Sequence, residues 1–468
     1  MIHSLIDSSG DCAKAVTLPE VLAAKEARSQ RQQEMLKKYN LPLVSITINM
    51  PGPNKDLPVL RRLCDYAVAE LKADFKTHEI LQLYLLTGPE ALLVIDRPVQ
   101  ELKAKAVAIE EAQPFGRLLD IDVFTNDGNL VSRRQQGRSR ACLVCGQDTI
   151  ICMRENRHQL ADLMSAVNKL LVRFKAYLTH NLSPEAQRIG QLAVEAMLFE
   201  VACTPAPGLV DRNNSGAHND MDFFTFMAST AALSSAMART AQAGINHEGN
   251  LADMLPVLRA IGIEAEQAML AATSGVNTQK GLLFSLGIAA AAAGHLQRRG
   301  RQLKAECILD IIAEITAGIV ERELGSSAQL PDHELTAGER LYRQHKITGI
   351  RGEMENGLPA VREVAIPALK QSLAAGLSAN DALIDTLLAL MMKVDDTTVM
   401  HRHNPDKMRY WVRDKAAAAL MEGGIASEGG RASIERLDKE FIAHNVSPGG
   451  AADLLAVAWF LHRLETES

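Results

Sequence analysis

The sequence predicts a multidomain protein in which an α+β domain (residues 1–180) is followed by an all-α domain (residues 181–468). First, the chain has 468 residues, about three times the ~150 residues of a typical single domain. Second, short apolar runs alternate with helical stretches before residue 180. Third, the pattern becomes helical almost to the end after Ser183-Pro184, which reads as a helix N-cap with proline at the first helical position. We place the boundary within residues 176–186.

In the first half, residues 43–48 and 81–86 have the composition of strands, and residues 56–75 and 156–177 have helical spacing. Residues 120–133 predict a strand, a turn at 126–129 and a second strand, because Asp127-Gly128 tolerates the positive φ that tight hairpins need. We therefore expect a mixed or antiparallel sheet.

In the second half, Ala-rich apolar stripes at helical spacing predict helices. The predicted helices cover residues 185–202, 223–244, 282–295, 303–323, 381–393 and 451–464.

The composition excludes several classes of protein. Fifty Lys and Arg against 56 Asp and Glu give a net charge of −6, which argues against a globally basic nucleic-acid binder. Seven cysteines, an odd number, do not suggest a secreted disulfide framework. The charged N-terminus does not fit a signal peptide, and the longest apolar stretch, residues 282–295, is shorter than the ~20 residues of a membrane span. We expect a cytoplasmic protein that binds neither nucleic acid nor membrane.

The pair Asp120 and Asp122 is the most informative pattern in the first half. Side chains at i and i+2 of a strand share a face, so the two carboxylates repel unless a cation lies between them. Mg²⁺ suits such a site and would neutralise a departing pyrophosphate. The neighbouring arginines suit phosphate oxygens, and they are Arg117, Arg133, Arg134, Arg138 and Arg140. The simpler interpretation is an exposed hairpin with a charged edge.

Four other residues of the first half have a separate interpretation. Cys142 and Cys145 have the spacing of a zinc-binding pair, and Cys152 and His158 could complete the ligand set. Reduced cysteines also pack simply as small apolar residues. Both interpretations remain open at this stage.

Several motifs together resemble the apo-citrate lyase phosphoribosyl-dephospho-CoA transferase family over roughly residues 1–180. They are Gly116-Arg-Leu-Leu-Asp-Ile-Asp-Val, Ser132-Arg-Arg, Arg140-Ala-Cys-Leu-Val-Cys and His158-Gln-Leu, with residues 41–45 and 51–56. The resemblance implies a nucleotidyltransferase-like domain. Its activity would move the phosphoribosyl-dephospho-CoA group onto a serine of the acyl-carrier (gamma) subunit of citrate lyase, with release of pyrophosphate.

Four polar clusters interrupt the helices of the second half, at residues 204–222, 275–281, 349–357 and 447–453. Each alone has the composition of a capped turn, but four in one all-helical domain predict a polar pocket. Lys280 at a helix start makes an anion site plausible, although the Walker A sequence is missing. Asp395-Asp396 and His401-Arg402 add a candidate metal or acid–base group.

In this order, the clusters resemble triphosphoribosyl-dephospho-CoA synthase over about residues 185–468. The shared motifs are Thr204-Pro-Ala-Pro-Gly-Leu-Val-Asp, Gly216-Ala-His-Asn-Asp-Met, Gly275-Val-Asn-Thr, Arg351-Gly-Glu and Ser447-Pro-Gly-Gly-Ala-Ala-Asp-Leu-Leu. The resemblance implies that ATP and 3′-dephospho-CoA give triphosphoribosyl-dephospho-CoA and adenine by single displacement. Gln279 is a departure, because the family usually has His before the Lys.

On this basis we expect specific roles. Lys280, Arg351 and Arg212 would bind the triphosphate, and His218 is a candidate general acid or a structural histidine. Further substrate contacts are expected from Asn277, Ser447, Gly449 and Gly450. The candidates for metal ligand or base in the second half are Asp211, Asp220, Asp222, Glu353 and Asp396. Our metal-ligand candidates for the whole chain are Asp220 and Asp222 from this set and Asp120 and Asp122 in the first half.

The two implied reactions are consecutive, which favours a bifunctional transferase that uses Mg²⁺, ATP and 3′-dephospho-CoA. One alternative is a zinc-stabilised carrier-protein-binding module fused to a nucleotide hydrolase, which a tightly bound zinc would favour. Another is an acyl-carrier-protein chaperone with a degenerate site.

Overall fold

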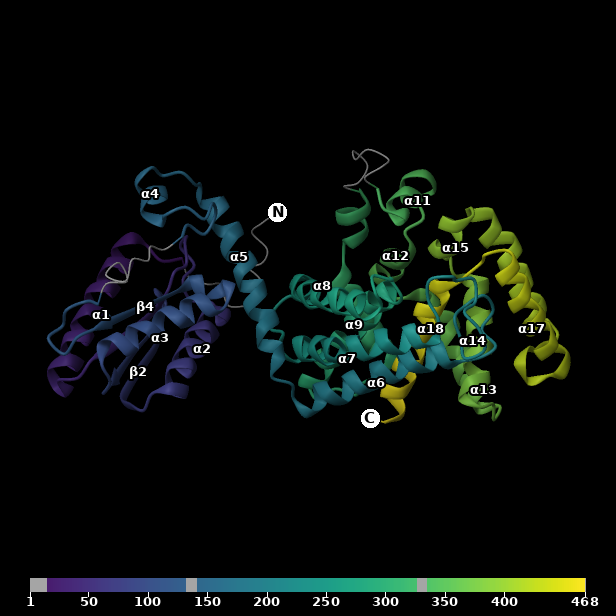
Figure 1. The fold of residues 1–468 in the computed structure, drawn as a ribbon, viewed down its shortest axis with the longest axis horizontal. Coiled ribbons are helices and arrows are strands. Elements are labelled where there is room, and N and C mark those ends of the chain that lie inside the picture. Colours follow the sequence, from purple (N-terminus) through teal and green to yellow (C-terminus); the bar gives the residue numbers. More distant parts are fainter. Residues whose placement is uncertain (1–14, 132–140, 326–334, 468) are drawn as a thin grey trace. The chain divides into compact units, whose positions relative to one another are not determined.

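The computed structural model describes residues 15–131, 141–325 and 335–467 (Figure 1). It divides the chain into two compact units, Met1–Tyr177 and Leu178–Ser468. The division falls inside the interval 176–186 in which the sequence changes its periodicity.

The first unit combines helices with one four-stranded sheet. Its elements are α1 (Leu18–Tyr39), β1 (Leu43–Ile48), α2 (Pro58–Asp74), β2 (Thr77–Leu85), β3 (Gly88–Ile95), α3 (Val99–Ala112), the 3₁₀ segment η1 (Pro114–Leu118), β4 (Leu119–Phe124), α4 (Thr149–Arg154) and α5 (Leu160–Tyr177). The strand order is β2-β3-β1-β4 and every pairing is antiparallel. From β1 to β4 the order of elements and strands is that of the ferredoxin-like βαββαβ motif.

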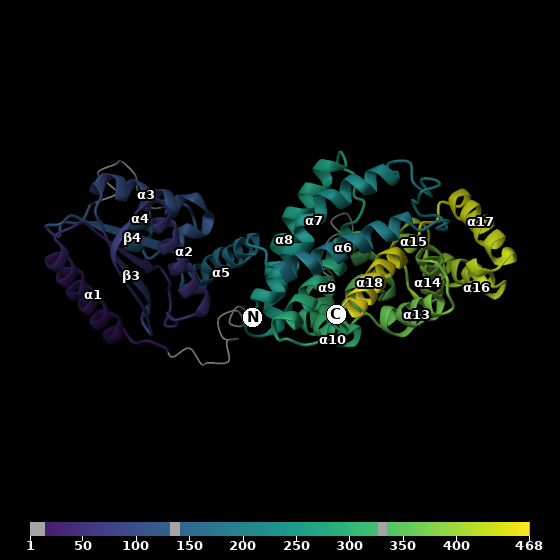
Figure 2. The ribbon, with the colours of Figure 1, turned by 90° about the horizontal axis from the view of Figure 1, so that it is seen from below.

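The sheet is covered on both faces. Helices α2 and α3 pack against one face, and α1 lies along the other (Figure 2). On the α1 side, Met35 and Leu36 form an apolar cluster with Leu43, Leu92 and Val94. The side chains of this face come from alternate positions of each strand, so Ser45 and Thr47 share it with Leu43.

The sequence predicted β1 to the residue, and β2, α2 and α5 to within a few residues. The expected antiparallel hairpin after β4 is reduced. Gly128 does adopt a positive φ of 80°, but the described part of the returning segment makes a single bridge, between Phe124 and Leu130. Residues 132 and 133 of that predicted strand lie outside the described residues.

The described residues of the second unit contain helices and no strands. The α-helices are α6 (Pro184–Ala202), α7 (Phe223–Asn246), α8 (Leu255–Ala272), α9 (Lys280–Arg298), α10 (Ala305–Thr316), α11 (Ala337–His345), α12 (Gly349–Glu355), α13 (Ile366–Ala374), α14 (Ala379–Lys393), α15 (Thr397–Arg402), α16 (Arg413–Met421), α17 (Glu428–Ala443) and α18 (Gly449–Thr466). Among the described residues, no helix combines the length and apolar character needed to cross a bilayer.

Close helix packing forms the core of this unit. A Cβ added to Gly244 of α7 would lie 1.9 Å from the carbonyl oxygen of Ala291 in α9, and one added to Gly294 would lie 2.1 Å from that of Ala241. The two backbones therefore touch, and Ala289 to Ala293 are fully buried between neighbours. This arrangement explains why the central helices are rich in alanine and glycine.

Two local features test the helix predictions. Ser183 caps α6 as expected, since its hydroxyl accepts a hydrogen bond from the Ala186 N–H (3.1 Å). The helix predicted over residues 303–323 is too long, because α10 ends at Thr316. Gly318 then takes a φ of 71°, a conformation that a helix does not accommodate.

Candidate functional site

A pocket of about 760 Å³ in the second unit lies where the polar segments between helices meet. All four predicted clusters contribute to its lining, and so does the segment just before α15. The predicted site residues that line it are His218, Asp220, Asn277, Lys280, Glu353, Asp396, Ser447, Gly449 and Gly450.

Asp211 organises the loop between α6 and α7 and does not line the pocket. Its carboxylate accepts hydrogen bonds from the Thr204 hydroxyl (2.5 Å) and from the N–H groups of Ala206 (3.1 Å), Asn213 (2.7 Å) and Asn214 (3.0 Å). With only 2% of the residue exposed, these bonds use the carboxylate fully. The structure therefore gives Asp211 a loop-forming role, and the catalytic role expected from the sequence stays a prediction.

Three further predicted residues also lie outside the pocket lining. Asp222 caps α7 through the Thr225 N–H (2.8 Å), and hydrogen bonds from Thr225 lower the pKa of its carboxyl. Arg212 donates to Asn380 (2.9 Å). Arg351 donates to Glu323 (2.5 Å), on the side of α12 that turns away from the pocket. Arg212 and Arg351 therefore do not line the pocket in this arrangement, and their expected role at the triphosphate stays a prediction.

His218 lies at the pocket within a group of polar side chains. Its Nε2 is 2.9 Å from the Ser447 hydroxyl, and its Nδ1 is 3.3 Å from the Arg402 guanidinium. Burial and the Arg402 charge lower the pKa of the imidazole. The lowered pKa makes the ring less suited to hold and donate a proton near neutral pH.

Asp396 connects the starts of two helices. One oxygen accepts from the N–H groups of Thr398 (2.9 Å) and Val399 (3.3 Å) in α15, and the other accepts from Ala451 (2.9 Å) in α18. Burial raises the pKa of this carboxyl, while the backbone donors oppose the rise. Gly450 packs closely beside it, because an added Cβ would lie 3.1 Å from the carboxylate.

Three more carboxyl groups of the pocket have raised pKa values. Burial raises the pKa of Glu200 to about 8. Burial also raises the pKa of Asp453 well above its usual range, and the neighbouring charges of Glu200 and Asp396 add to the effect. Glu353 has a pKa raised by burial, although one of its oxygens accepts from the Ala360 N–H (3.0 Å). Sequence reasoning missed Glu200, since it is one of three glutamates in α6 and belongs to none of the polar clusters.

Cationic side chains also line the pocket. Lys280 begins α9 and pairs with Glu266 (2.5 Å), and Arg409 pairs with Asp395 (2.9 Å). Lys346, Lys393 and Arg402 join them. The residue before α9, Gln279, makes no side-chain capping bond, so the helix N-terminus adds its positive end to this group. The five cations come from five different helices or connections, and Lys346, Lys393 and Arg409 were not recognised from sequence.

Gln279 is buried at the pocket wall, with 3% of the residue exposed. Its side-chain oxygen accepts hydrogen bonds from the hydroxyl groups of Ser229 (2.8 Å) and Thr230 (3.2 Å). The residue that departs from the family motif is thus held by two partners on α7.

In the first unit, Asp120 and Asp122 lie on one face of β4, opposite Thr47 and Ser45 of β1. Helix α1 packs on this face over β1 and β3, and Asp120 and Asp122 are half-buried residues that both make interactions in the structure. Arg133, Arg134, Arg138 and Arg140 lie outside the described residues.

The first unit also has a pocket, of about 900 Å³, whose lining includes Asn49, Arg117 and Cys142. The Arg117 guanidinium donates to the backbone carbonyl oxygens of Ala141 (2.7 Å) and Cys142. It therefore supports the wall of the pocket through backbone contacts.

Comparison with known proteins identifies both parts of the chain. Residues 186–468 match the family described as ATP:dephospho-CoA triphosphoribosyl transferase, and residues 16–174 match the apo-citrate lyase phosphoribosyl-dephospho-CoA transferase family.

Two relatives named Protein CitXG align along nearly the whole chain. The one from Leuconostoc mesenteroides subsp. cremoris is 33% identical and covers 96% of this chain and 97% of its own length. The one from Haemophilus influenzae is 31% identical and covers 95% and 96%. A 2-(5''-triphosphoribosyl)-3'-dephosphocoenzyme-A synthase from Pectobacterium atrosepticum is 41% identical over 60% of this chain and 90% of its own.

Each half of the chain thus matches a family of transferases. The chain belongs to the ATP:dephospho-CoA triphosphoribosyl transferase family, in the fused form that also has an apo-citrate lyase phosphoribosyl-dephospho-CoA transferase unit, and it is a bifunctional transferase of citrate lyase prosthetic-group synthesis.

Proposed function

We propose that the 760 Å³ pocket of the second unit is where ATP and 3′-dephospho-CoA react to release adenine. The observation that supports this most strongly is the pairing of buried carboxyl groups with a set of cations in one cavity. The cations suit a triphosphate, and the carboxyl groups suit proton transfer at a ribose.

The carboxyl groups divide into two roles in this proposal. The pKa of Glu200, about 8, keeps its carboxyl protonated near neutral pH, so Glu200 holds the proton that leaving adenine needs. The Glu353 carboxylate accepts only one backbone hydrogen bond among those described, and it acts as the base for the attacking ribose 2′-hydroxyl. Neutral His218 orients Ser447 at the pocket wall. Of the two roles that the sequence left open for His218, general acid or structural histidine, this proposal takes the structural one.

The triphosphate binds to Lys280, Lys346 and Lys393, with the start of α9 as a further anion contact. Oxygen ligands of the kind that Mg²⁺ prefers are present in the same pocket. Asp453 fits the ion best, because a bound cation would offset the burial and the neighbouring carboxyl groups that raise its pKa. Asp220, which also lines the pocket, remains a candidate, and Asp222 does not. When bound, Mg²⁺ would supply charge neutralisation of the triphosphate.

For the first unit, we propose a nucleotidyltransferase-like site on the face of β4 that carries Asp120 and Asp122. Paired carboxylates on one face suit a Mg²⁺ ion that neutralises the departing pyrophosphate. The acceptor is a serine of the acyl-carrier (gamma) subunit of citrate lyase. The support is the family match and the same-face geometry of the two side chains.

The first test is chromatographic. Purified protein is incubated with ATP, Mg²⁺ and 3′-dephospho-CoA, without carrier protein, and free adenine is measured. We expect adenine only when 3′-dephospho-CoA is present. Adenine or phosphate released from ATP alone would favour a nucleotide hydrolase, and no release from a folded preparation would contradict the proposed reaction in this pocket.

The second test adds apo carrier subunit to the products of the first. We expect pyrophosphate release and a mass increase of the carrier by one phosphoribosyl-dephospho-CoA group. Carrier binding without either change would instead indicate a chaperone with a degenerate site.

A further inference from the structure

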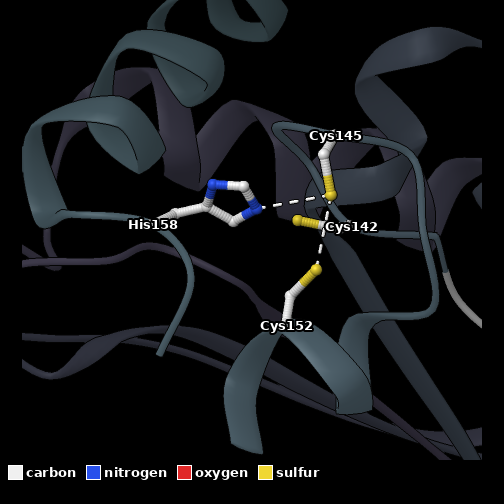
Figure 3. Close-up of side chains that lie close together, drawn as sticks. All are labelled: Cys142, Cys145, Cys152 and His158. Carbon is white, nitrogen blue, oxygen red and sulfur yellow. Dashed lines mark hydrogen bonds between the residues drawn. The ribbon is translucent and has the colours of Figure 1, made fainter. Parts of the chain in front are cut away.

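Three cysteines and one histidine of the first unit converge in space. The ligand atoms of Cys142, Cys145, Cys152 and His158 all lie within 4.8 Å of one another. The Cys145 and Cys152 sulfur atoms are 3.3 Å apart, and His158 Nε2 is 3.3 Å from the Cys145 sulfur (Figure 3). Around a tetrahedral zinc ion with bonds of about 2.3 Å, neighbouring sulfur atoms would be about 3.8 Å apart. The four atoms are therefore spaced for one metal ion with small adjustments.

The ligands come from three consecutive local structures. Cys142 and Cys145 lie on a tight turn closed by the Ala141–Asp148 bridge and by a hydrogen bond from the Gly146 N–H to the Cys142 carbonyl oxygen (3.1 Å). Gly146 has a φ of 73°, which lets the chain turn back directly after Cys145. Cys152 is on α4, and His158 is in the segment between α4 and α5. The described backbone thus brings together ligands that span 17 positions.

The turn is also supported from outside. The Val144 N–H points to the Cys142 sulfur at 3.5 Å, a contact that stabilises a thiolate. Arg117 holds the carbonyl groups of Ala141 and Cys142.

Burial gives a second, independent reason to expect a metal. Within residues 141–159, Cys142 and Cys152 are the buried residues, while Val144, Ile151 and Met153 are exposed. A segment with so little apolar burial does not compensate the entropy of ordering its chain. Small segments of this kind are usually fixed by disulfides or by a structural metal.

We propose that Cys142, Cys145, Cys152 and His158 bind one structural Zn²⁺ ion. Three thiolates and one imidazole, closed to further ligands, are a typical structural zinc set, and binding releases the three thiol protons. The ion fixes the segment that forms one wall of the 900 Å³ pocket, because Cys142, Cys152 and His158 line that pocket. This differs from the zinc-binding module considered from sequence, because here the metal stabilises a transferase unit.

The test measures metal in the full-length chain, purified under reducing conditions and without chelators. We expect about one zinc per chain. After chelation and refilling with Co²⁺ in place of zinc, the absorption bands of tetrahedral thiolate-bound cobalt should appear. Cys152→Ser and His158→Ala should each lower zinc affinity by about tenfold or more. His158→Cys should retain zinc as a four-cysteine site, and Cys307→Ser, in α10, is the matched control that should leave metal content unchanged.

Three results would overturn the proposal. One is a refilled wild-type chain with far less than one metal per chain. Another is a Cys152→Ser chain with unchanged zinc affinity. The last is a Cys145–Cys152 disulfide, detected by mass spectrometry, in wild-type protein kept under reducing conditions. Because the readout is metal content and the cobalt spectrum, these results do not depend on either transferase reaction.

Discussion

Gly281 offers a sharp test of the pocket, because its neighbour is the Asp453 carboxylate. A Cβ at position 281 would lie 2.2 Å from Asp453 Oδ2 and 3.3 Å from its Cγ, so the carboxylate or α9 must move. Gly262 in α8 is the matched control, since a Cβ there meets nothing within 4 Å. Both positions are helical, so each Gly→Ala change gains up to about 1 kcal/mol of helix stability.

The difference between the two variants gives the magnitude. Overpacking costs about 1–3 kcal/mol, so Gly281→Ala should be less stable than Gly262→Ala by that amount. Displacing a reacting group by about 1 Å can lower a rate by roughly 100-fold, so we expect adenine release to fall on that scale in Gly281→Ala alone. Urea unfolding followed by tryptophan fluorescence reports on the second unit, since Trp411 and Trp459 both lie there. Equal stability gains and full adenine release in both variants would refute the reasoning.

Three other substitutions separate the two reactions and the role of burial. Asp120→Asn should abolish carrier modification and leave adenine release intact, as measured by carrier mass and by chromatography. Lys280→Ala should lower kcat/KM for adenine release by roughly 10–100-fold, which corresponds to the loss of one charge-assisted hydrogen bond. The carrier should still be modified from preformed intermediate. Loss of both activities in a folded protein would show that the two reactions do not belong to separate units. Glu200→Gln should change how stability depends on pH. Burial raises the Glu200 pKa from 4.5 to about 8, so the folded state holds this proton more tightly than the unfolded state. The resulting contribution to the free energy of unfolding is complete below about pH 4.5. It falls by about 1.4 kcal/mol per pH unit as the pH rises to about 8. The variant should lack that slope in urea unfolding at pH 6, 7 and 8, and an unchanged slope would exclude Glu200 as its source.

The parts of the fold that the sequence predicts are those with a local signal. The apolar residues of strand β1 and helix α2 are regularly spaced, and Ser183 is a recognisable N-cap that marks the start of α6. Strand β3 gives no alternation, because seven of its eight residues are buried and both of its faces are covered. Gly318 could have indicated the end of α10, but the apolar spacing continues past it over residues 303–323, and the predicted helix was therefore too long.

The candidate site shows a similar limit. Arg351 and Glu353 are two residues apart on α12, so about 200° separates their side chains around the helix axis. Glu353 lines the pocket and Arg351 does not, a difference that helical geometry could have indicated in advance. Glu200, Lys393 and Arg409 could not have been found in this way, since they reach the pocket only through the packing of helices far apart in sequence.

The Asp396 carboxylate has a consequence for how the enzyme recognises its substrates. The Asp396 carboxylate accepts N–H hydrogen bonds from the first turns of both α15 and α18. Thr398 and Gly449 therefore have a nearly fixed spacing at one side of the cavity. A nucleotide that is too bulky on that side meets backbone that does not yield without breaking buried hydrogen bonds. An isosteric Asn at position 396 would place its amide N–H group against one of the backbone N–H donors that Asp396 now accepts from. Few residues other than Asp therefore fit at this position. A group bound on that side therefore meets a wall whose shape is set by the backbone.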